Sequence, residues 1–142
     1  MKKRILVIDD DWDLLAAIKE NLQSHHFSCS TISSPDVGFE EALRWRPHLI
    51  LLDLVLPKMS GLGFLREIKN NPALRHIPVI ILSGMSDEEV AQEGMDLGAV
   101  AYLSKTCSAR ELVATLEEYL QEDIYGGKYH DPGEKNQYSH CG

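Results

Sequence analysis

The segment ILVIDDDWD, residues 5–13, constrains the fold more strongly than any other part of the chain. Four apolar residues run directly into three adjacent carboxylates, Asp9, Asp10 and Asp11. A continuous apolar run of this length favours a strand that is covered on both faces, as in a parallel sheet. Neighbouring carboxylates raise one another's pKa unless a positive charge or water compensates them. The segment therefore predicts a buried strand that ends at an exposed turn or at a cation site.

Composition narrows the class of protein. The chain has 142 residues, of which 44% are hydrophobic and 25% charged, and this balance suits one globular domain. A net charge of -8 argues against nucleic acid as a direct partner, because phosphate backbones attract Lys and Arg. No segment approaches the roughly 18 apolar residues of a membrane span, and the first apolar run is too short for a signal peptide. Three widely spaced cysteines indicate no disulfide framework. We therefore expect a cytoplasmic protein without membrane contacts.

Strand-length apolar runs alternate with helical patterns along the chain. The expected strands cover residues 4–8, 27–32, 48–52, 77–82 and 100–103. This alternation predicts one α/β domain over residues 1–122, with a parallel sheet and helices on both faces. Residues 123–142 are polar, turn-rich and aperiodic, and we expect a tail or linker there.

Several helix starts carry capping signals. Asp11 is the expected N-cap of a helix over residues 12–24, and Ser34 precedes a proline at the first position of the next helix. Ser86 and Ser108 each stand three residues before a glutamate, the spacing of a capping box.

Polar side chains follow four of the expected strands. The three adjacent acids follow the first strand, Asp53 the third, Ser83 the fourth and Lys105 the fifth. In doubly wound sheets, sites form beyond the carboxyl ends of the strands, so these residues should meet. Oxygen ligands in an open cleft favour Mg²⁺. A carboxylate can accept a phosphoryl group while the metal and Lys105 neutralise its charge, and Ser83 can donate a hydrogen bond to it.

Four segments, in this order and spacing, resemble the receiver domain of two-component response regulators, the CheY-like family. They read ILVIDDD, LILLDLVLPKMSG, PVIILSG and GAVAYLSK. The resemblance covers about residues 3–122. It implies a flavodoxin-like five-stranded sheet of order 2-1-3-4-5 and phosphorylation by a histidine kinase or phosphotransfer protein. It also implies a downstream protein partner on the face of the fourth helix, fifth strand and fifth helix, and a possible phosphorylation-dependent dimer.

The resemblance implies a role for each matching residue of the metal site. Asp53 corresponds to the phosphoaccepting aspartate, which also binds Mg²⁺. Asp10 corresponds to the direct metal ligand, and Asp9 to the neighbour that holds an ordered water. The backbone carbonyl of Val55 corresponds to the group that completes the metal shell. Such a domain catalyses only its own phosphorylation and dephosphorylation, so we expect no enzyme with a small-molecule substrate.

The remaining matches concern the phosphoryl group and the switch. Ser83 and Lys105 correspond to the residues that contact phosphoryl oxygens, and Tyr102 to the aromatic side chain that moves inward when the hydroxyl shifts. One position departs from the family, which usually has proline after the lysine, often with a cis peptide. Here Thr106 follows, and a non-proline cis bond costs about 2.5–4 kcal/mol. The bond either carries that strain or is trans and presents Lys105 differently.

Other functions remain open at this point. Asp9 and Asp11 form a DxD motif, typical of haloacid-dehalogenase-like phosphatases, in which Asp9 would be the nucleophile and Asp11 the general acid. That alternative leaves Asp53 without a role. A third possibility is a module that binds a partner without accepting phosphate. A receiver domain could stand alone or precede an output domain.

Overall fold

The computed structural model describes residues 2–56, 61–84 and 88–120, in which strands and helices alternate. The strands are β1 (Arg4–Ile8), β2 (Ser28–Ile32), β3 (Leu49–Asp53), β4 (Val79–Ser83) and β5 (Ala101–Ser104). The helices are α1 (Trp12–Ser24), α2 (Pro35–Trp45), α3 (Gly61–Asn70), α4 (Glu88–Asp96) and α5 (Ala109–Leu120). Within this described part of the chain, no helix has the length and apolar character needed to cross a bilayer.

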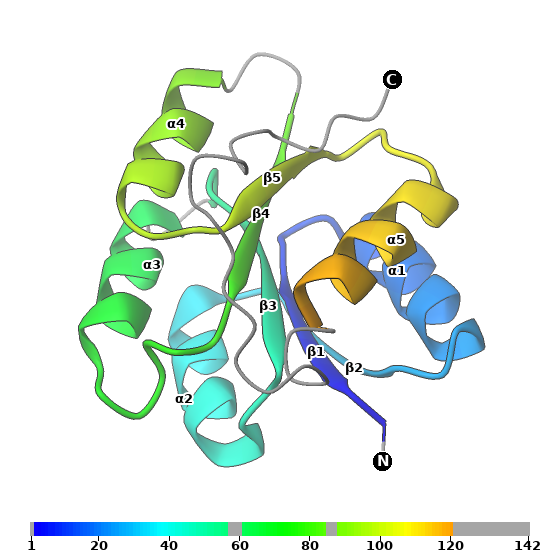
Figure 1. Cartoon of the computed structure of the whole chain (residues 1–142), viewed down its shortest axis with the longest axis horizontal. Coiled ribbons are helices and arrows are strands. Elements are labelled where there is room, and N and C mark those ends of the chain that lie inside the picture. Colours follow the sequence, from blue (N-terminus) through cyan, green and yellow to red (C-terminus); the bar gives the residue numbers. More distant parts are fainter. Residues whose placement is uncertain (1, 57–60, 85–87, 121–142) are drawn as a thin grey trace.

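The strands form one parallel sheet in the order β2-β1-β3-β4-β5, as predicted (Figure 1). The order reverses at β1, which pairs with β2 on one side and with β3 on the other. Because Ile8 lies beside Leu52, the residues that follow β1 emerge next to the end of β3. The carboxyl ends of the strands therefore share one edge of the sheet, and their amino ends share the opposite edge.

Both faces of the sheet are covered. Figure 1 shows α1 and α5 on one face and α2, α3 and α4 on the other. Side chains alternate between the faces along each strand, so Ile5 and Val7 join the core under α1 and α5, while Leu6 and Ile8 join the core under the other three helices. This double burial explains why β1, β3 and β4 read as uninterrupted apolar runs.

The first strand is confirmed as predicted, and the boundaries of the other four differ from the prediction by one or two residues. The fourth strand was expected over residues 77–82 but covers Val79–Ser83. Pro78 has no N–H to donate, although its carbonyl accepts a hydrogen bond from Ile50 N at 3.0 Å, so the ladder starts after it. The third strand extends to Asp53, which pairs with Leu82. The phosphoacceptor candidate is thus anchored within the sheet.

Two of the predicted helix caps are confirmed. The side chain of Asp11 accepts hydrogen bonds from Asp13 N at 3.0 Å and Leu14 N at 3.1 Å. Ser108 Oγ accepts one from Glu111 N at 3.0 Å. The prediction for Ser34 was wrong in part, because it occupies the N-cap position but its side chain makes no capping bond. Its backbone carbonyl accepts from Gly38 N instead. The expected cap at Ser86 lies outside the described residues.

Candidate functional site

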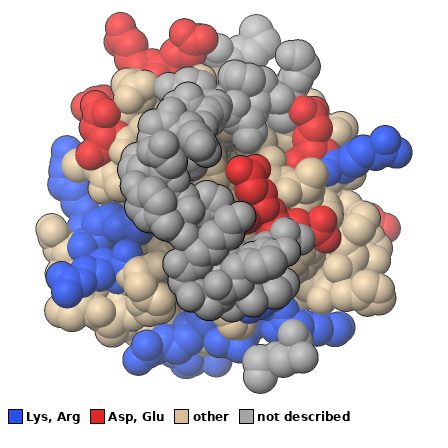
Figure 2. Space-filling model, viewed as in Figure 1, with Lys and Arg blue, Asp and Glu red and all other residues tan. Residues whose placement is uncertain are grey.

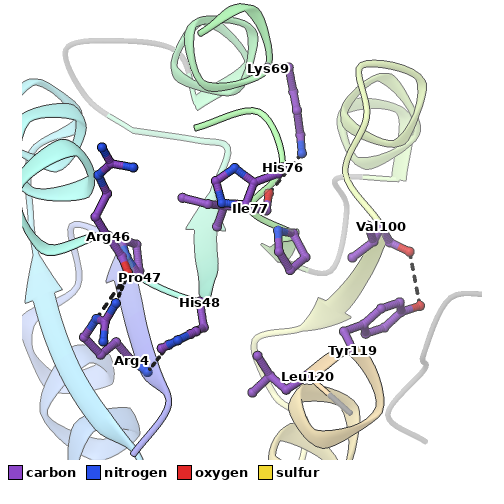
Figure 3. A pocket seen from close by; sticks show the side chains of 11 residues that line it. Arg4, Arg46, Pro47, His48, Lys69, His76, Ile77, Val100, Tyr119 and Leu120 are labelled. Carbon is purple, nitrogen blue, oxygen red and sulfur yellow. Dashed lines mark hydrogen bonds between the residues drawn. The ribbon is translucent and has the colours of Figure 1, made fainter. Parts of the chain in front are cut away.

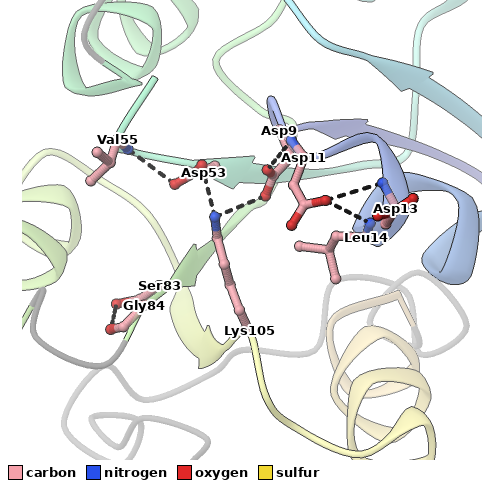
Figure 4. Close-up of polar contacts among 9 residues, drawn as sticks. All are labelled: Asp9, Asp11, Asp13, Leu14, Asp53, Val55, Ser83, Gly84 and Lys105. Carbon is pink, nitrogen blue, oxygen red and sulfur yellow. Dashed lines mark hydrogen bonds and ion pairs between the residues drawn. The ribbon is translucent and has the colours of Figure 1, made fainter. Parts of the chain in front are cut away.

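Acids from β1 and β3 meet a lysine from beyond β5 at the carboxyl edge of the sheet (Figure 4). Lys105 Nζ lies 2.9 Å from Asp53 Oδ2 and 3.2 Å from Asp9 Oδ2. The backbone brings Lys105 there, since its N–H donates to the Ser83 carbonyl at 2.9 Å and so continues the β4–β5 pairing. The structure therefore brings together residues 9, 53 and 105, which the sequence places on three different strands' ends.

The adjacent acids are buried to very different degrees. Asp9 is 0% exposed and Asp53 is 2% exposed, whereas Asp10 is exposed. Backbone amides hold the two buried side chains: Asp11 N donates to Asp9 Oδ1 at 2.9 Å, and Val55 N donates to Asp53 Oδ1 at 3.0 Å. Buried carboxylates are costly unless they are hydrogen-bonded or paired with a cation. One lysine serves both of them here.

The titration properties reflect this crowding. Burial raises the pKa of Asp9, and the neighbouring Asp53 charge adds to that effect, while the Asp11 amide and Lys105 oppose it. Burial by itself lowers the pKa of Lys105, but the hydrogen bond and charge of Asp53, together with Asp9, outweigh burial and raise the pKa. Among the described residues, the site thus holds more negative charge than Lys105 neutralises.

The donor set fits a hard divalent cation. Oxygens of Asp9, Asp10 and Asp53 lie within 4.8 Å of one another. Two oxygens on opposite sides of one Mg²⁺ stand about 4 Å apart, because each Mg–O bond is about 2.1 Å long. Asp9 Oδ2 is buried and has no hydrogen-bond partner among residues 2–56, 61–84 and 88–120, although it lies at ion-pair distance from Lys105. A cation would compensate this oxygen and the surplus negative charge.

The other predicted site residues surround this centre. Ser83 is buried at the end of β4, and its Oγ donates to the Gly84 carbonyl at 3.0 Å rather than to Asp53 (Figure 4). Val55 contributes its backbone amide to Asp53, and its side chain is 55% exposed. Tyr102 is half-buried on β5 and packs against the core under α2, α3 and α4. The roles predicted for Ser83, Tyr102 and the Val55 carbonyl stay predictions.

The Lys105–Thr106 peptide bond is trans, which resolves the alternative raised by the missing proline. The trans bond still presents Lys105 Nζ to both buried acids. Local contacts shape this turn: Thr106 N donates to Ser104 Oγ at 3.1 Å, and Cys107 N donates to the Ser104 carbonyl at 3.1 Å. A proline at position 106 could not supply the first of these bonds.

The sequence analysis missed the part played by Gly61. A Cβ at this position would lie 2.5 Å from Leu54 Cα and 2.6 Å from the Asp53 carbonyl oxygen, and Gly61 N donates to the Leu54 carbonyl at 3.0 Å. Only glycine allows α3 to begin this close to the backbone that carries Asp53. The available signal was a glycine directly before an amphipathic helix and close after Asp53.

Sequence comparison identifies related proteins. Residues 5–117 match the family described as the response regulator receiver domain. A probable cyclic di-GMP phosphodiesterase from Vibrio cholerae is 38% identical over 82% of this chain and 26% of its own length. The phosphate regulon transcriptional regulatory protein PhoB from Pseudomonas aeruginosa is 32% identical over 84% of this chain and 52% of its own length. This chain thus spans about half, or less, of these curated relatives.

Structural comparison gives the same result. A response regulator receiver domain protein from Clostridium thermocellum is 32% identical to this chain, with a TM-score of 0.79. The similarity covers 87% of this chain and 98% of that one. The described fold therefore corresponds to nearly the whole of that solved receiver structure.

Proposed function

The chain belongs to the family of response regulator receiver domains, and we propose from this premise that Asp53 accepts a phosphoryl group in a Mg²⁺-dependent reaction. Asp9, Asp10, Asp53 and the Val55 carbonyl would hold the metal. The donor would be a phosphohistidine of a histidine kinase or phosphotransfer protein. The domain would run over residues 1–122, with residues 123–142 as a tail or linker.

The observation that supports this proposal most strongly is the environment of Asp53. Its carboxylate is nearly fully buried, yet Val55 N and Lys105 Nζ bind one oxygen each. A structural aspartate at the end of an apolar strand has no need of this arrangement. Phosphoryl transfer depends mainly on positioning and on neutralising charge, and the amide and the ammonium supply both around Asp53.

The chemistry is a direct displacement at phosphorus. A carboxylate oxygen of Asp53 donates an electron pair to phosphorus, the P–N bond to the donor imidazole breaks, and the imidazole keeps that bonding pair and takes up a proton. Mg²⁺, when bound, neutralises charge on the phosphoryl oxygens. Lys105 stays beside the new acyl phosphate as a fixed positive charge. The Ser83 hydroxyl would leave the Gly84 carbonyl and donate to a phosphoryl oxygen.

Phosphorylation would shift the equilibrium between two pre-existing conformations of the domain, because the phosphoryl group makes more favourable contacts in one of them. Rotation of Ser83 would be accompanied by inward movement of Tyr102, and the partner would bind the face formed by α4, β5 and α5. A phosphorylation-dependent dimer through that face belongs to the same proposal, as does a cytoplasmic location. One relative is described as a probable phosphodiesterase and another as a transcriptional regulatory protein. The names of these relatives therefore do not identify the partner of this chain.

The phosphatase alternative is not supported, because residues 5–117 match the family of receiver domains. The geometry also argues against it. Asp11, the proposed general acid, caps α1 with its side chain, whereas Asp53 lies at the centre of the polar contacts. We propose that this domain turns over no small-molecule substrate and catalyses only its own phosphorylation and dephosphorylation.

The test is phosphotransfer from a small phosphodonor such as acetyl phosphate, followed by intact mass spectrometry. The parent chain should gain one phosphoryl group in the presence of Mg²⁺ and much less with a chelator. Asp53→Asn should abolish the gain, since an amide cannot act as the nucleophile. Asp11→Asn is the matched control, because asparagine is also a good N-cap, and it should leave the gain unchanged.

A phosphoryl gain that survives in Asp53→Asn and disappears in Asp9→Asn would contradict the proposal and restore the phosphatase alternative. Circular dichroism of each variant verifies that the loss is chemical and not a failure to fold. No gain in any condition, from a folded parent chain, would favour the module that binds partners without accepting phosphate.

A further inference from the structure

A second polar pocket lies at the opposite edge of the sheet, beyond the amino ends of β1, β3 and β4 (Figure 3). Its volume is about 480 Å³, within the range of roughly 300–1,000 Å³ typical of ligand pockets. Its lining comes from distant parts of the sequence: Arg4, Arg46, Pro47, His48, Lys69, His76, Ile77, Pro78, Val100, Tyr119 and Leu120. The phosphorylation chemistry uses none of these residues.

The charge of the lining is the informative feature. The whole chain carries 22 acids against 14 Lys and Arg, yet the pocket includes Arg4, Arg46 and Lys69 and not one acid. None of these three cations pairs with an acid of the described residues. Figure 2 shows most Lys and Arg side chains of this face along its left and lower margins. Within the described residues, the cations of this pocket are thus not compensated by acids.

Backbone carbonyls bind all three of these cations, and Arg46 donates from Nε to the Leu43 carbonyl at 3.2 Å. Arg4 donates from Nε to the Trp45 carbonyl at 2.9 Å and from Nη2 to the Arg46 carbonyl. Lys69 Nζ donates to the carbonyls of Arg75 and Ile77 at 3.2 and 3.0 Å. An ammonium has three N–H donors, so Lys69 retains one. These bonds orient the charges without neutralising them, which is the arrangement that an anion would complete.

Apart from the imidazoles of His48 and His76, the rest of the lining is apolar or aromatic. Pro47, Ile77 and Leu120 are buried. Tyr119 and Leu120 stand across the pocket from the arginines, with the Tyr119 hydroxyl donating to the Val100 carbonyl at 3.2 Å, whereas Pro47 lies beside Arg46 (Figure 3). Cations on one side, with Tyr119 and Leu120 on the other, fit an amphipathic ligand. A bare ion would use only half of this surface.

We propose that this pocket binds an oxyanion, a carboxylate or a phosphate, carried on a compact apolar group. Lys69 and Arg46 supply the charge, and the wall around Tyr119 receives the apolar part. The same chemistry has two possible sources: a free small molecule, or the acids at positions 122, 123, 131 and 134, which follow Leu120 in the sequence. The proposal is independent of the phosphoacceptor function.

Inorganic phosphate is the probe, titrated into the ¹⁵N-labelled full chain with EDTA present and ionic strength held constant with chloride. Keeping ionic strength constant removes general screening from the comparison. Saturable shifts of the Ile77 and Val100 amides are expected. Lys69→Met should weaken binding about tenfold, the effect of one lost charge-assisted hydrogen bond. Arg46→Gln is the second variant, because it leaves the carbonyl contacts of Lys69 in place.

The matched control is Lys19→Met, which removes an exposed cation from α1 and should leave the affinity unchanged. A full chain with Glu122→Gln, Asp123→Asn, Asp131→Asn and Glu134→Gln distinguishes the sources. Tighter phosphate binding by this variant than by the parent means that the chain's own carboxylates occupy the pocket, and equal binding means a free ligand. Either outcome supports the site.

The proposal is overturned if neither the parent nor the four-substitution variant shows saturable shifts at Ile77 and Val100. It is equally overturned if Lys19→Met weakens binding as much as Lys69→Met, since that result indicates general attraction to surface charge.

Discussion

The two edges of the sheet differ in the partners that they give to a lysine. At the carboxyl edge, two buried carboxylates share the ammonium of Lys105. At the amino edge, the ammonium of Lys69 donates to backbone carbonyls and pairs with no carboxylate of the described residues. The strands between them are four or five residues long, so roughly 17 Å separates the edges. The comparison teaches that neighbours, more than burial alone, decide what a lysine does in this fold.

The contrast appears in the pKa values of the two lysines. Burial lowers the pKa of Lys69, and no carboxylate opposes the effect. Burial also acts on Lys105, but the adjacent Asp53 and Asp9 reverse it and raise the pKa. Lys105 is therefore a cation held in place by two buried carboxylates. Lys69 is a cation whose charge is only partly compensated.

The largest expected effect is on the rate of phosphorylation, which should depend on Lys105 and not on Lys69. Lys105→Met should slow phosphorylation by acetyl phosphate by about 10²–10³-fold, the usual cost of losing one preorganised group that stabilises developing charge. Lys69→Met should leave the rate within about twofold, because it lies at the other edge. Initial rates by intact mass spectrometry at saturating Mg²⁺ measure both. Equal rates in the two variants would contradict the proposal that only Lys105 takes part in phosphorylation.

The next effect tests how tightly the carboxyl edge is built. Gly61→Ala should destabilise the domain by about 1–3 kcal/mol, because the new methyl group meets backbone atoms that cannot rotate away. The matched control is Gly63→Ala in the same helix, where a Cβ meets nothing within 4 Å. That change should stabilise by about 0.5–1 kcal/mol through the lower helix propensity of glycine. Urea unfolding reports both.

Stabilisation by Mg²⁺ should depend on residues at the carboxyl edge of the sheet and not on those at the amino edge. At a Mg²⁺ concentration ten times its Kd, the free energy of unfolding should rise by about 1.4 kcal/mol, since the ion binds only the folded site. Asp9→Asn should lose most of this gain, and Lys69→Met should keep it. Thermal unfolding with and without Mg²⁺ is the measurement. An unchanged Tm in the parent chain would contradict metal binding at the acids.

The smallest effect is the order in which the lysines titrate. In metal-free buffer, NMR of ¹³Cε-labelled lysine should show Lys69 losing its proton at lower pH than Lys105. Lysine has an ordinary pKa of 10.5, and a lowered folded pKa means that stability from Lys69 rises with pH just below that value. A raised folded pKa means that the contribution of Lys105 is complete below 10.5 and is lost above it. The reverse order would show that the carboxylates do not control Lys105.

Much of the fold followed from local pattern. Apolar runs separated by amphipathic segments located the five strands to within two residues, and the Asp11 and Ser108 caps were visible as short motifs. Strand and helix periodicity depend on neighbours a few residues away, so the sequence contains them directly. The boundary at β4 moved only because Pro78 cannot join the ladder as a donor.

The sequence predicted which residues form the site but not how deeply each of them is buried. That residues 9, 53 and 105 would converge follows from their positions after parallel strands. That Asp9 would be fully buried while Asp10 stays exposed does not follow, because the two are adjacent and identical. The sequence also did not predict that position 61 lacks space for a Cβ atom, since this depends on how closely α3 approaches the end of β3.

The sequence alone determined the alternation of elements, the family and the identity of the acids and the lysine, because each of these is encoded in short segments. Only the tertiary structure decided which carboxylate is buried, that Lys105 reaches two of them through a trans peptide, and that Arg4, Arg46 and Lys69 line one pocket without an acid. Charge acts through space, and the distances that set its strength exist only after distant segments have packed.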